Sequence, residues 1–289
     1  MTRIKTSLPG KNCKYPVAFV SNSESNLNMP NIINVHELTR RFELPDRDIV
    51  AADEITFHVG AGEVFGLLGP NGAGKTTAMR MILGLLKANS GFAEIHGFRS
   101  DHEPEEVKRR VGFVSSSAGV YQWLTAHEML SFFGDVYGMS AADCESRIAE
   151  LSKLLGFEEL LHRRCAGFST GEKQRVNLAR AMIHDPSVMI FDEPTLGLDV
   201  VGSQVIFRHI DLLREQNKAV ILCTHRLEQA QRVCDRFGLL HHGKLVLGGT
   251  LAELQQKTGR QDLVEIFVDI IDGLHCQKET AVPQGTEAV

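Results

Sequence analysis

A glycine-rich segment in the first third of the chain has the residues and the spacing of a phosphate-binding loop. It reads Gly69, Pro70, Asn71, Gly72, Ala73, Gly74, Lys75, Thr76 and Thr77. Its glycines allow backbone N–H groups to turn toward an anion at a helix N-terminus. Lys75 could then reach the β- and γ-phosphates of a nucleotide, and the Thr76 hydroxyl could ligate Mg²⁺. Because an apolar strand-like run precedes the loop and an apolar helical segment follows it, we predict nucleotide binding rather than a chance turn.

Two adjacent carboxylates end an apolar run further along the chain. The run is Val188–Phe191, and Asp192, Glu193 and Pro194 follow it directly. Adjacent residues on a strand point to opposite faces, so one carboxylate can face a metal ion while the next faces an attacking water. We expect Asp192 on the Mg²⁺ side and Glu193 as the general base. Alone, the pair is also typical of a solvated strand end; beside a phosphate-binding loop it indicates the second half of one site.

A third segment has the pattern of a capped helix whose N-terminus can attract a phosphate. It comprises Phe168–Arg175, in which Ser169 and Glu172 have the spacing of a capping box. An apolar stripe follows, as expected for a helix that buries one face. An exposed, capped N-terminus is a ready anion site. A capped helix without a ligand is the alternative that these residues leave open.

The elements that must position these groups alternate between short apolar strands and helical patterns. This alternation is typical of an α/β fold with a mostly parallel sheet. Alternating apolar residues near Phe57 predict an antiparallel strand as well. From about residue 118 to 165 strand signals vanish and apolar residues recur at helical spacing, which predicts a helical insertion. Two C-terminal helices are expected within residues 250–272. The buried strands are predicted at Val64–Leu68, Val188–Phe191 and 219–222.

Composition excludes several classes of protein. The net charge of −5 gives no basic surplus for a polyanion, so we expect no nucleic-acid partner. No apolar run approaches the roughly 18 residues that span a bilayer. The six cysteines are scattered, which is typical of reduced thiols in a cytosolic protein. Polar composition predicts a disordered extension over 1–30 and a disordered tail over 273–289, and Met29 is an alternative start.

These motifs together resemble those of the ATP-binding-cassette (ABC) ATPases. The phosphate-binding loop, the run Ile190–Asp199 and the run Cys223–Ala230 stand in that family's order, and Phe168–Arg175 is similar to its signature segment. The finer resemblance is to ATPase subunits of ABC-2-like exporters, especially the bacterial sodium-export (NatA-type) subfamily. It implies a P-loop NTPase core with an antiparallel β subdomain and an inserted helical subdomain, over residues 31–272.

The family resemblance also implies roles for further residues. In that family two cassettes enclose two ATP molecules, each between one subunit's phosphate-binding loop and the other's signature segment. Ser169, Gly171 and Glu172 would therefore contact ATP across a homodimer, and Asp199 falls on the inter-subunit loop. His225 matches the histidine that contacts the γ-phosphate and the attacking water. Phe42 stands where the family stacks an aromatic ring on adenine, with a core phenylalanine as the alternative.

The segment 115–123 departs from the common pattern. Most cassettes have a glutamine that contacts Mg²⁺ at the position of Ser116. A serine hydroxyl is compatible with a metal, so Ser116 is a candidate Mg²⁺ ligand through a bridging water, and a solvated turn is the alternative. Trp123, the only tryptophan, is expected either in the core or as an exposed anchor for a membrane subunit.

The chain is therefore expected to be the ATP-binding and ATP-hydrolysing subunit of an ABC exporter, with ATP and Mg²⁺ as cofactors. Its expected partners are a second copy of itself and an integral membrane permease, which would place it on the cytoplasmic face of the membrane. Lys75, Glu193 and His225 are the expected catalytic residues, and sodium ion efflux is the finer expectation. A cassette ATPase acting in translation or DNA maintenance is the alternative, although such relatives usually carry tandem cassettes or a coiled-coil insertion.

Overall fold

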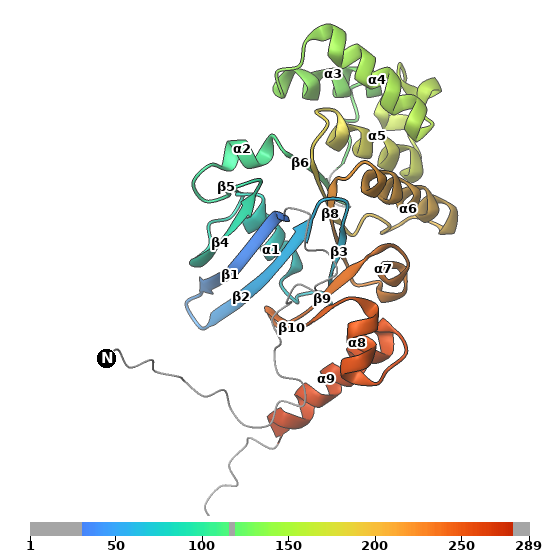
Figure 1. Cartoon of the computed structure of the whole chain (residues 1–289). Coiled ribbons are helices and arrows are strands. Elements are labelled where there is room, and N and C mark those ends of the chain that lie inside the picture. The colour runs from blue at the N-terminus through green and yellow to red at the C-terminus, as the bar shows by residue number, and fades with distance from the viewer. Residues whose placement is uncertain (1–30, 116–118, 280–289) are drawn as a thin grey trace, which may run out of the picture.

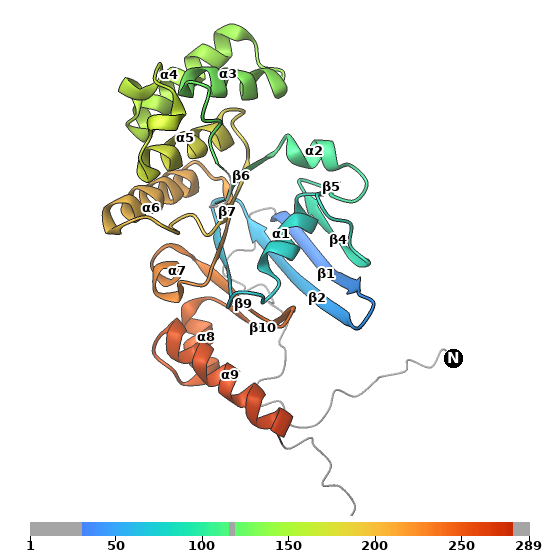
Figure 2. The ribbon, with the colours of Figure 1, turned by 180° about the vertical axis from the view of Figure 1, so that it is seen from behind.

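The computed structural model describes residues 31–115 and 119–279, which form two sheets with helices around them (Figures 1 and 2). The first part of the chain contains β1 (Asn31–Glu43), β2 (Asp48–Gly60), β3 (Val64–Leu68), α1 (Lys75–Ile82), β4 (Ser90–Ile95), β5 (Phe98–Arg99), α2 (Pro104–Lys108) and β6 (Val111–Ser115). The middle part contains α3 (Ala126–Val136), α4 (Ala141–Leu155), α5 (Thr170–Met182) and β7 (Val188–Asp192). The last part contains α6 (Val200–Glu215), β8 (Ala219–Thr224), α7 (Leu227–Val233), β9 (Arg236–His241), β10 (Lys244–Gly249), α8 (Leu251–Thr258) and α9 (Leu263–Glu279).

The central sheet has six strands in the order β10-β9-β3-β8-β7-β6. All neighbouring strands pair in parallel except β9 and β10. Every residue of β3 and β8 is buried, which explains why these strands are continuous apolar runs rather than alternating ones. Their carboxyl ends lie at one edge of the sheet, so the loops that follow β3, β7 and β8 are brought together there.

A second, antiparallel sheet packs beside the central one, with strand order β2-β1-β4-β5. The alternation predicted near Phe57 is present, because Ile55, Phe57 and Val59 are buried between partly exposed neighbours on β2. Phe57 stacks on Phe65 of β3 with ring centroids 4.6 Å apart, which ties the two sheets together. The predicted α/β fold with an antiparallel β subdomain is confirmed.

The helical insertion stands apart from both sheets, as Figures 1 and 2 show for α3 and α4. Thr125 begins α3 with a complete capping box, and the Ser140 hydroxyl accepts from the Asp143 amide at the start of α4. The two helices share a buried cluster with α5 and with β7. A Cβ at Gly134 would overlap the Cys144 sulfur, so glycine allows α3 and α4 to approach closely.

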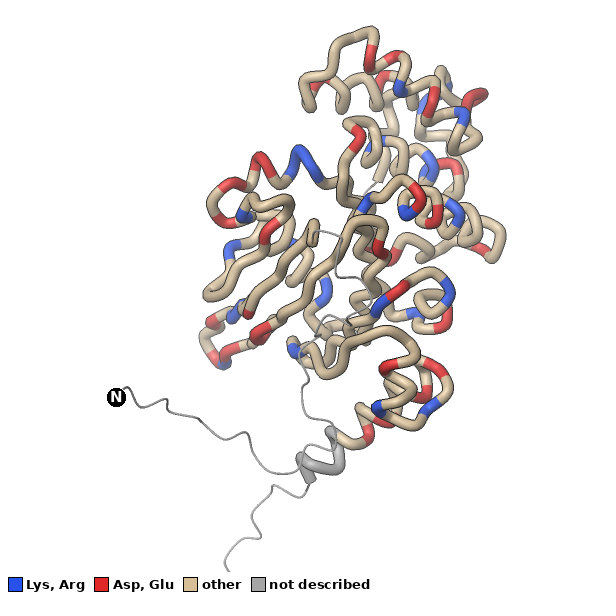
Figure 3. The backbone as a smooth tube through the Cα atoms, in the orientation of Figure 1, with Lys and Arg blue, Asp and Glu red and all other residues tan. Residues whose placement is uncertain are grey.

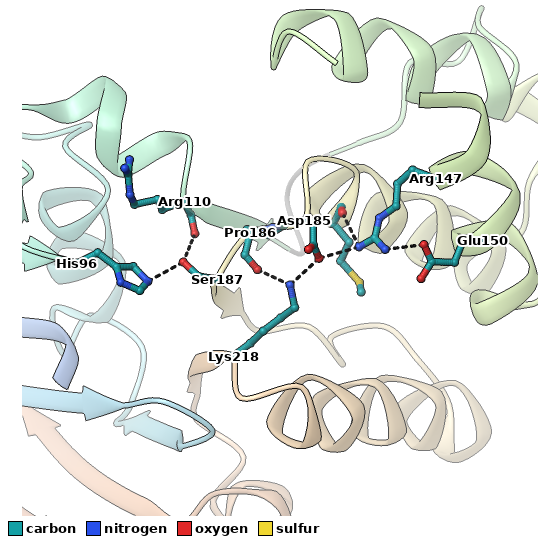
Figure 4. Close-up of polar contacts among 9 residues, drawn as sticks. His96, Arg110, Arg147, Glu150, Asp185, Pro186, Ser187 and Lys218 are labelled. Carbon is teal, nitrogen blue, oxygen red and sulfur yellow. Dashed lines mark hydrogen bonds and ion pairs between the residues drawn. The ribbon is translucent and has the colours of Figure 1, made fainter. Parts of the chain in front are cut away.

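A chain of polar contacts joins the subdomains at the loop between α5 and β7 (Figure 4). The Asp185 carboxylate accepts from Lys218 of the core at 2.7 Å and from Arg147 of α4 at 3.1 Å. Two residues later, the Ser187 hydroxyl is 2.8 Å from the His96 ring in the β4–β5 turn. All three subdomains therefore meet at this loop.

The C-terminal helices pack on the outer side of β9 and β10 through a third buried cluster that includes Leu254 and Ile266. The prediction of a tail that begins at Gly273 was wrong in its boundary, because α9 continues to Glu279. Among the described residues, no helix is both long and apolar enough to cross a membrane.

Candidate functional site

The glycine-rich loop lies between β3 and α1 at the edge of a cavity of about 340 Å³. The loop takes the helix N-terminal position predicted for it, and α1 begins within the motif, at Lys75. The cavity is lined by Ile49, Val50 and Ala51 of β2, by Pro70, Asn71, Gly72, Ala73, Gly74, Lys75, Thr76 and Thr77 of the loop, and by Asp192, Glu193 and His242. One cavity therefore brings the loop and both carboxylates together, as the sequence predicted. Gly69 contributes to the loop through its carbonyl oxygen.

Lys75 is the buried cation of this cavity. Its ammonium donates hydrogen bonds to the Gly69 carbonyl at 2.6 Å and to the Pro70 carbonyl at 3.1 Å. It also lies 3.9 Å from the Glu193 carboxylate, and its side chain is 7% exposed. A buried, charge-paired ammonium inside a turn of backbone N–H groups is suited to neutralising a phosphate.

Gly74 requires glycine for two separate reasons. Its φ is +107°, in the region that other residues avoid, and a Cβ there would overlap the Ala51 carbonyl of β2. At the preceding residue, the Ala73 carbonyl accepts a hydrogen bond from the Gly243 amide at 2.8 Å, so the β9–β10 turn also holds the loop in place. The loop is thus held between β2 and the β9–β10 turn, which are far apart in sequence.

The two carboxylates follow β7 and differ in their surroundings. Asp192 is the last residue of the strand, whereas Glu193 has a φ of +49°, which turns the chain out of the sheet. The Glu193 carboxylate accepts from the Thr224 hydroxyl at 2.9 Å, from the His225 amide at 3.0 Å and from the His225 ring at 2.7 Å. Residues at the end of β8 therefore orient Glu193 within the cavity.

Asp192 and Thr76 supply oxygen donors of the kind that Mg²⁺ prefers. Burial is the main cause that raises the pKa of Asp192, the Glu193 charge raises it further, and Lys75 and Arg80 oppose them. One hydroxyl and one carboxylate in a cavity for a triphosphate fit an ion that takes its other ligands from phosphate and water. The third expected metal ligand, Ser116, lies outside the described residues.

The segment 168–175 forms the predicted capped helix end, but this end is not part of the cavity wall. The Ser169 hydroxyl accepts from the Glu172 amide, and the Glu172 carboxylate accepts from the Ser169 amide at 2.7 Å. Gly171 leaves open space, since a Cβ there would meet no atom within 4 Å. Asp199 caps α6 by accepting from the Gly202 amide at 2.7 Å. Of the described residues that line the cavity, none belongs to the segment 168–175 or is Asp199.

Phe42 lies beside the cavity rather than on its wall. It pairs with Ile49, which is a wall residue, and the Arg40 guanidinium lies 4.6 Å over its ring. Sequence reasoning missed Ile49, Val50 and His242 because exposed apolar residues and a lone turn histidine carry no motif. Their position depends on how β2 and the β9–β10 turn fold over the loop, which only the structure shows.

Comparison with known proteins identifies the family. The family model described as ABC transporter matches residues 52–196. The ABC transporter ATP-binding protein NatA of Bacillus subtilis (strain 168) is 37% identical over 238 residues, which cover 82% of this chain and 97% of that protein. The Nod factor export ATP-binding protein I of Paraburkholderia xenovorans (strain LB400) is 37% identical over 215 residues, 74% of this chain and 71% of that protein. The chain belongs to the ABC transporter family.

Solved structures agree with this assignment. The ATP-binding subunit of an ABC transporter superposes with a TM-score of 0.75 and 31% identity, covering 83% of this chain and 99% of that one. A dimeric ATP-binding cassette in a post-hydrolysis state, bound to ADP and Pi, superposes with a TM-score of 0.69 and 25% identity, covering 76% and 98%. This ABC chain is therefore an ATP-binding and ATP-hydrolysing transporter subunit.

Proposed function

We propose that the chain works as a homodimer in which each ATP lies between the loop of one copy and the signature segment (Phe168–Arg175) of the other. The observation that carries this proposal is the separation of the two phosphate-binding features within one chain. Ser169 and Gly171 present an exposed helix N-terminus away from the cavity that contains Lys75. Such an N-terminus suits a phosphate that arrives from outside the chain. The related dimeric cassette supports the same arrangement.

Hydrolysis is assigned to the groups around Glu193. Glu193 takes a proton from the attacking water, and Thr224 and His225 hold its carboxylate at the wall of the cavity. Lys75 and the loop amides bind the β- and γ-phosphates. Thr76 and Asp192 would hold Mg²⁺, which supplies further neutralisation of phosphate charge when bound. His225 orients Glu193 and, being partly exposed, can also contact the γ-phosphate.

A groove on the helical side of the molecule is the proposed seat of a membrane permease. It has a volume of about 220 Å³ and lies between the end of α1, β6, α3 and α5. Tyr121 stacks on Phe133, a residue of its wall, with ring centroids 6.3 Å apart. Tyr121 and Phe132 are exposed, and Trp123, two residues after Tyr121 in the sequence, is 80% exposed, so the core alternative for Trp123 is wrong. Aromatic side chains exposed together at a groove are typical of a protein interface.

Charge indicates what the permease should present to this groove. Arg180 lines it, its guanidinium lies 5.4 Å over the Phe133 ring, and burial lowers its pKa. Among the described residues Arg180 has no ion-pair partner, and a partly buried cation without a counter-charge is costly. A cytoplasmic segment of the permease with an apolar face and one carboxylate would satisfy both features.

Export is the proposed direction, and sodium ions are the proposed cargo because the NatA-type resemblance covers most of the chain. The subunit is proposed to lie at the cytoplasmic face of the membrane through its permease. No nucleic-acid partner is proposed, and Figure 3 shows acidic and basic residues interspersed over the tube.

Affinity purification of the tagged full-length chain from detergent-solubilised membranes of its host tests the proposal. We expect an integral membrane protein in a stable complex with two copies of the chain, together with ATP hydrolysis that requires Mg²⁺. Recovery of the chain with ribosomes or DNA, and in no membrane complex, would instead support the translation or DNA-maintenance alternative.

A further inference from the structure

We infer that Gln174 is a positioning residue that links the signature segment to Glu193 of the same chain, so that ATP bound at one composite site adjusts the base at the other. This inference rests on the proposed homodimer. It concerns a contact between two of the motifs, namely the hydrogen bond from the Gln174 side-chain amide to the Pro194 carbonyl at 3.0 Å.

The contact joins two elements with separate roles. Gln174 is in the second turn of α5, whose first residues form the signature end. Gly171 and Gln174 are three residues apart, so they lie on one face of the helix and about 4.5 Å apart along its axis. A helix this short moves as a rigid body, and a displacement of its N-terminus therefore reaches Gln174.

At its other end the contact reaches the turn that shapes Glu193. Pro194 follows Glu193 directly and is buried, and the Glu193 carbonyl accepts from the Leu196 amide at 3.0 Å. Because Glu193 has a φ of +49°, its orientation depends on the turn that follows it. Pulling on the Pro194 carbonyl therefore changes the direction of the Glu193 side chain.

The two ends belong to different ATP molecules in the proposed dimer. The signature end of one chain contacts the nucleotide held by its partner, whereas Glu193 acts on the nucleotide held by its own Lys75. Gln174 consequently connects occupancy of one site to the geometry of the base in the other.

The chain also contains a matched control. The next residue of the same turn, Thr195, donates from its hydroxyl to the Gln229 side chain of α7 at 2.8 Å. Gln229 therefore holds the same turn as Gln174 does, with one hydrogen bond, but from a helix that carries no part of the signature segment. Loss of Gln229 should disturb Glu193 without affecting communication between sites.

Double-mutant cycles on the turnover number distinguish the two glutamines. Gly171→Ala obstructs the signature end without a clash inside the chain, because a Cβ there meets no atom and the residue is helical. We combine it with Gln174→Leu in one cycle and with Gln229→Leu in the other. Each leucine variant alone should lower kcat about 2- to 12-fold, as expected for one neutral hydrogen bond. Thermal unfolding of every variant without nucleotide identifies effects on folding alone.

With Gln174→Leu, the combined loss of kcat should be at least about threefold smaller than the product of the two single losses, because the link through which Gly171 acts is already broken. When Gly171→Ala is combined with Gln229→Leu, the loss of kcat should equal the product of the two single losses. If the losses of kcat multiply in both double variants, or if both double variants deviate equally from the product, the role of Gln174 is overturned, while the proposed dimer is unaffected. If Gly171→Ala alone has no effect on kcat, the composite site and this inference fall together. Gln174→Glu, which keeps the shape and removes the donor, should behave as Gln174→Leu does.

Discussion

Glu193, the proposed general base, is oriented by neighbours that are distant in sequence. Its carboxylate is held by Thr224 and His225 and faces Lys75, and its backbone is in the left-handed region. A side chain that is 14% exposed and held on both oxygens keeps one orientation. The proposed role of Glu193 as a base therefore depends on the hydrogen bonds around its carboxylate as much as on its charge.

Replacement of this base should separate ATP binding from hydrolysis. Glu193→Gln keeps the shape, and its amide oxygen can still accept from the His225 amide while its NH2 group faces the Thr224 hydroxyl oxygen, but it cannot take a proton. We expect turnover to fall by 10²-fold or more, in the range of general-base losses, and ATP-stabilised dimers to accumulate in size-exclusion chromatography. Glu228→Gln, an exposed change on α7, is the control and should remain active. An active Glu193→Gln enzyme would contradict the assignment.

A buried histidine provides a test that depends on pH. His184 stacks on Tyr137 with centroids 3.7 Å apart, and burial is the main cause that lowers its pKa from 6.5 to about 4. Between these two values the unfolded chain binds a proton that the folded chain does not, so the free energy of unfolding decreases as pH falls from 6.5 to about 4. His184→Phe retains the stacking and removes this titration.

Thermal unfolding between pH 7 and pH 4.5 measures the effect. The melting temperature of the parent should fall more steeply with acidification than that of His184→Phe, and the two curves should be parallel above pH 7. Equal slopes for the parent and His184→Phe would show that His184 titrates alike in the folded and unfolded chains.

The helices and strands of the chain could be predicted where a short sequence pattern by itself determines the local structure. The capping box at Ser169, the buried strand β3 and the phosphate-binding loop follow from spacing and hydrophobic pattern alone. The end of α9 was not predictable, because polar residues after Gly273 continue the helix without an apolar pattern. Contacts such as Gln174 with Pro194 or Asp185 with Lys218 join residues that no local pattern relates. Ser116 lies outside the described residues, so its metal role stays a prediction.

Two glycines of the loop should differ sharply in what they tolerate. Both have positive φ, +80° for Gly72 and +107° for Gly74, so alanine pays a backbone cost of about 1–2 kcal/mol at either position. Only at Gly74 would the new Cβ overlap the backbone of β2, at the Ala51 carbonyl. Gly74→Ala should therefore lower the melting temperature clearly more than Gly72→Ala and abolish ATP binding.

Differential scanning fluorimetry of both variants, with and without ATP, measures the contrast. Gly72→Ala should remain folded at ambient temperature, since its Cβ meets no atom of the chain within 4 Å. Equal destabilisation by the two variants would show that backbone conformation, and not packing against β2, decides the requirement for Gly74.

At the scale of the whole molecule, the proposed ATP cavity and the proposed permease groove are joined by shared elements. α1 begins at the phosphate-binding loop, and the residues just beyond its C-terminal end, Leu83 and Leu85, line the groove. β6 contributes to the groove and pairs with β7, the strand that ends at Asp192. A single helix or a pair of neighbouring strands therefore connects each of these sites to the other.

The groove should be required for assembly but not for chemistry. Trp123→Ala and Arg180→Gln should each reduce co-purification with the permease by at least about tenfold, because central aromatic and arginine side chains contribute most at interfaces. ATP hydrolysis by the isolated subunit should remain within about twofold of the parent. Val268→Ala, another exposed apolar residue but on α9, is the matched control and should assemble normally.

Trp123 also reports on the same surface directly, since it is the only tryptophan. In the isolated subunit its emission should be red-shifted and quenched by iodide, and permease binding should shift the emission to the blue and protect it. Protection from iodide in the isolated subunit, or unchanged assembly of Trp123→Ala, would contradict the docking role.

The strand order of the central sheet has a consequence for how the protein is made. β3, which leads into the phosphate-binding loop, lies between β8 and β9, and Val64 pairs with Val220. On the ribosome the loop thus emerges long before the strands that flank it, and its supporting turn at Gly243 comes later still. Because strands paired over such distances close late, nascent chains that stop short of β9 should expose the apolar face of β3 and depend on chaperones. Nucleotide can help the chain to fold only near the end of synthesis, which makes late truncations as damaging as changes in the loop itself.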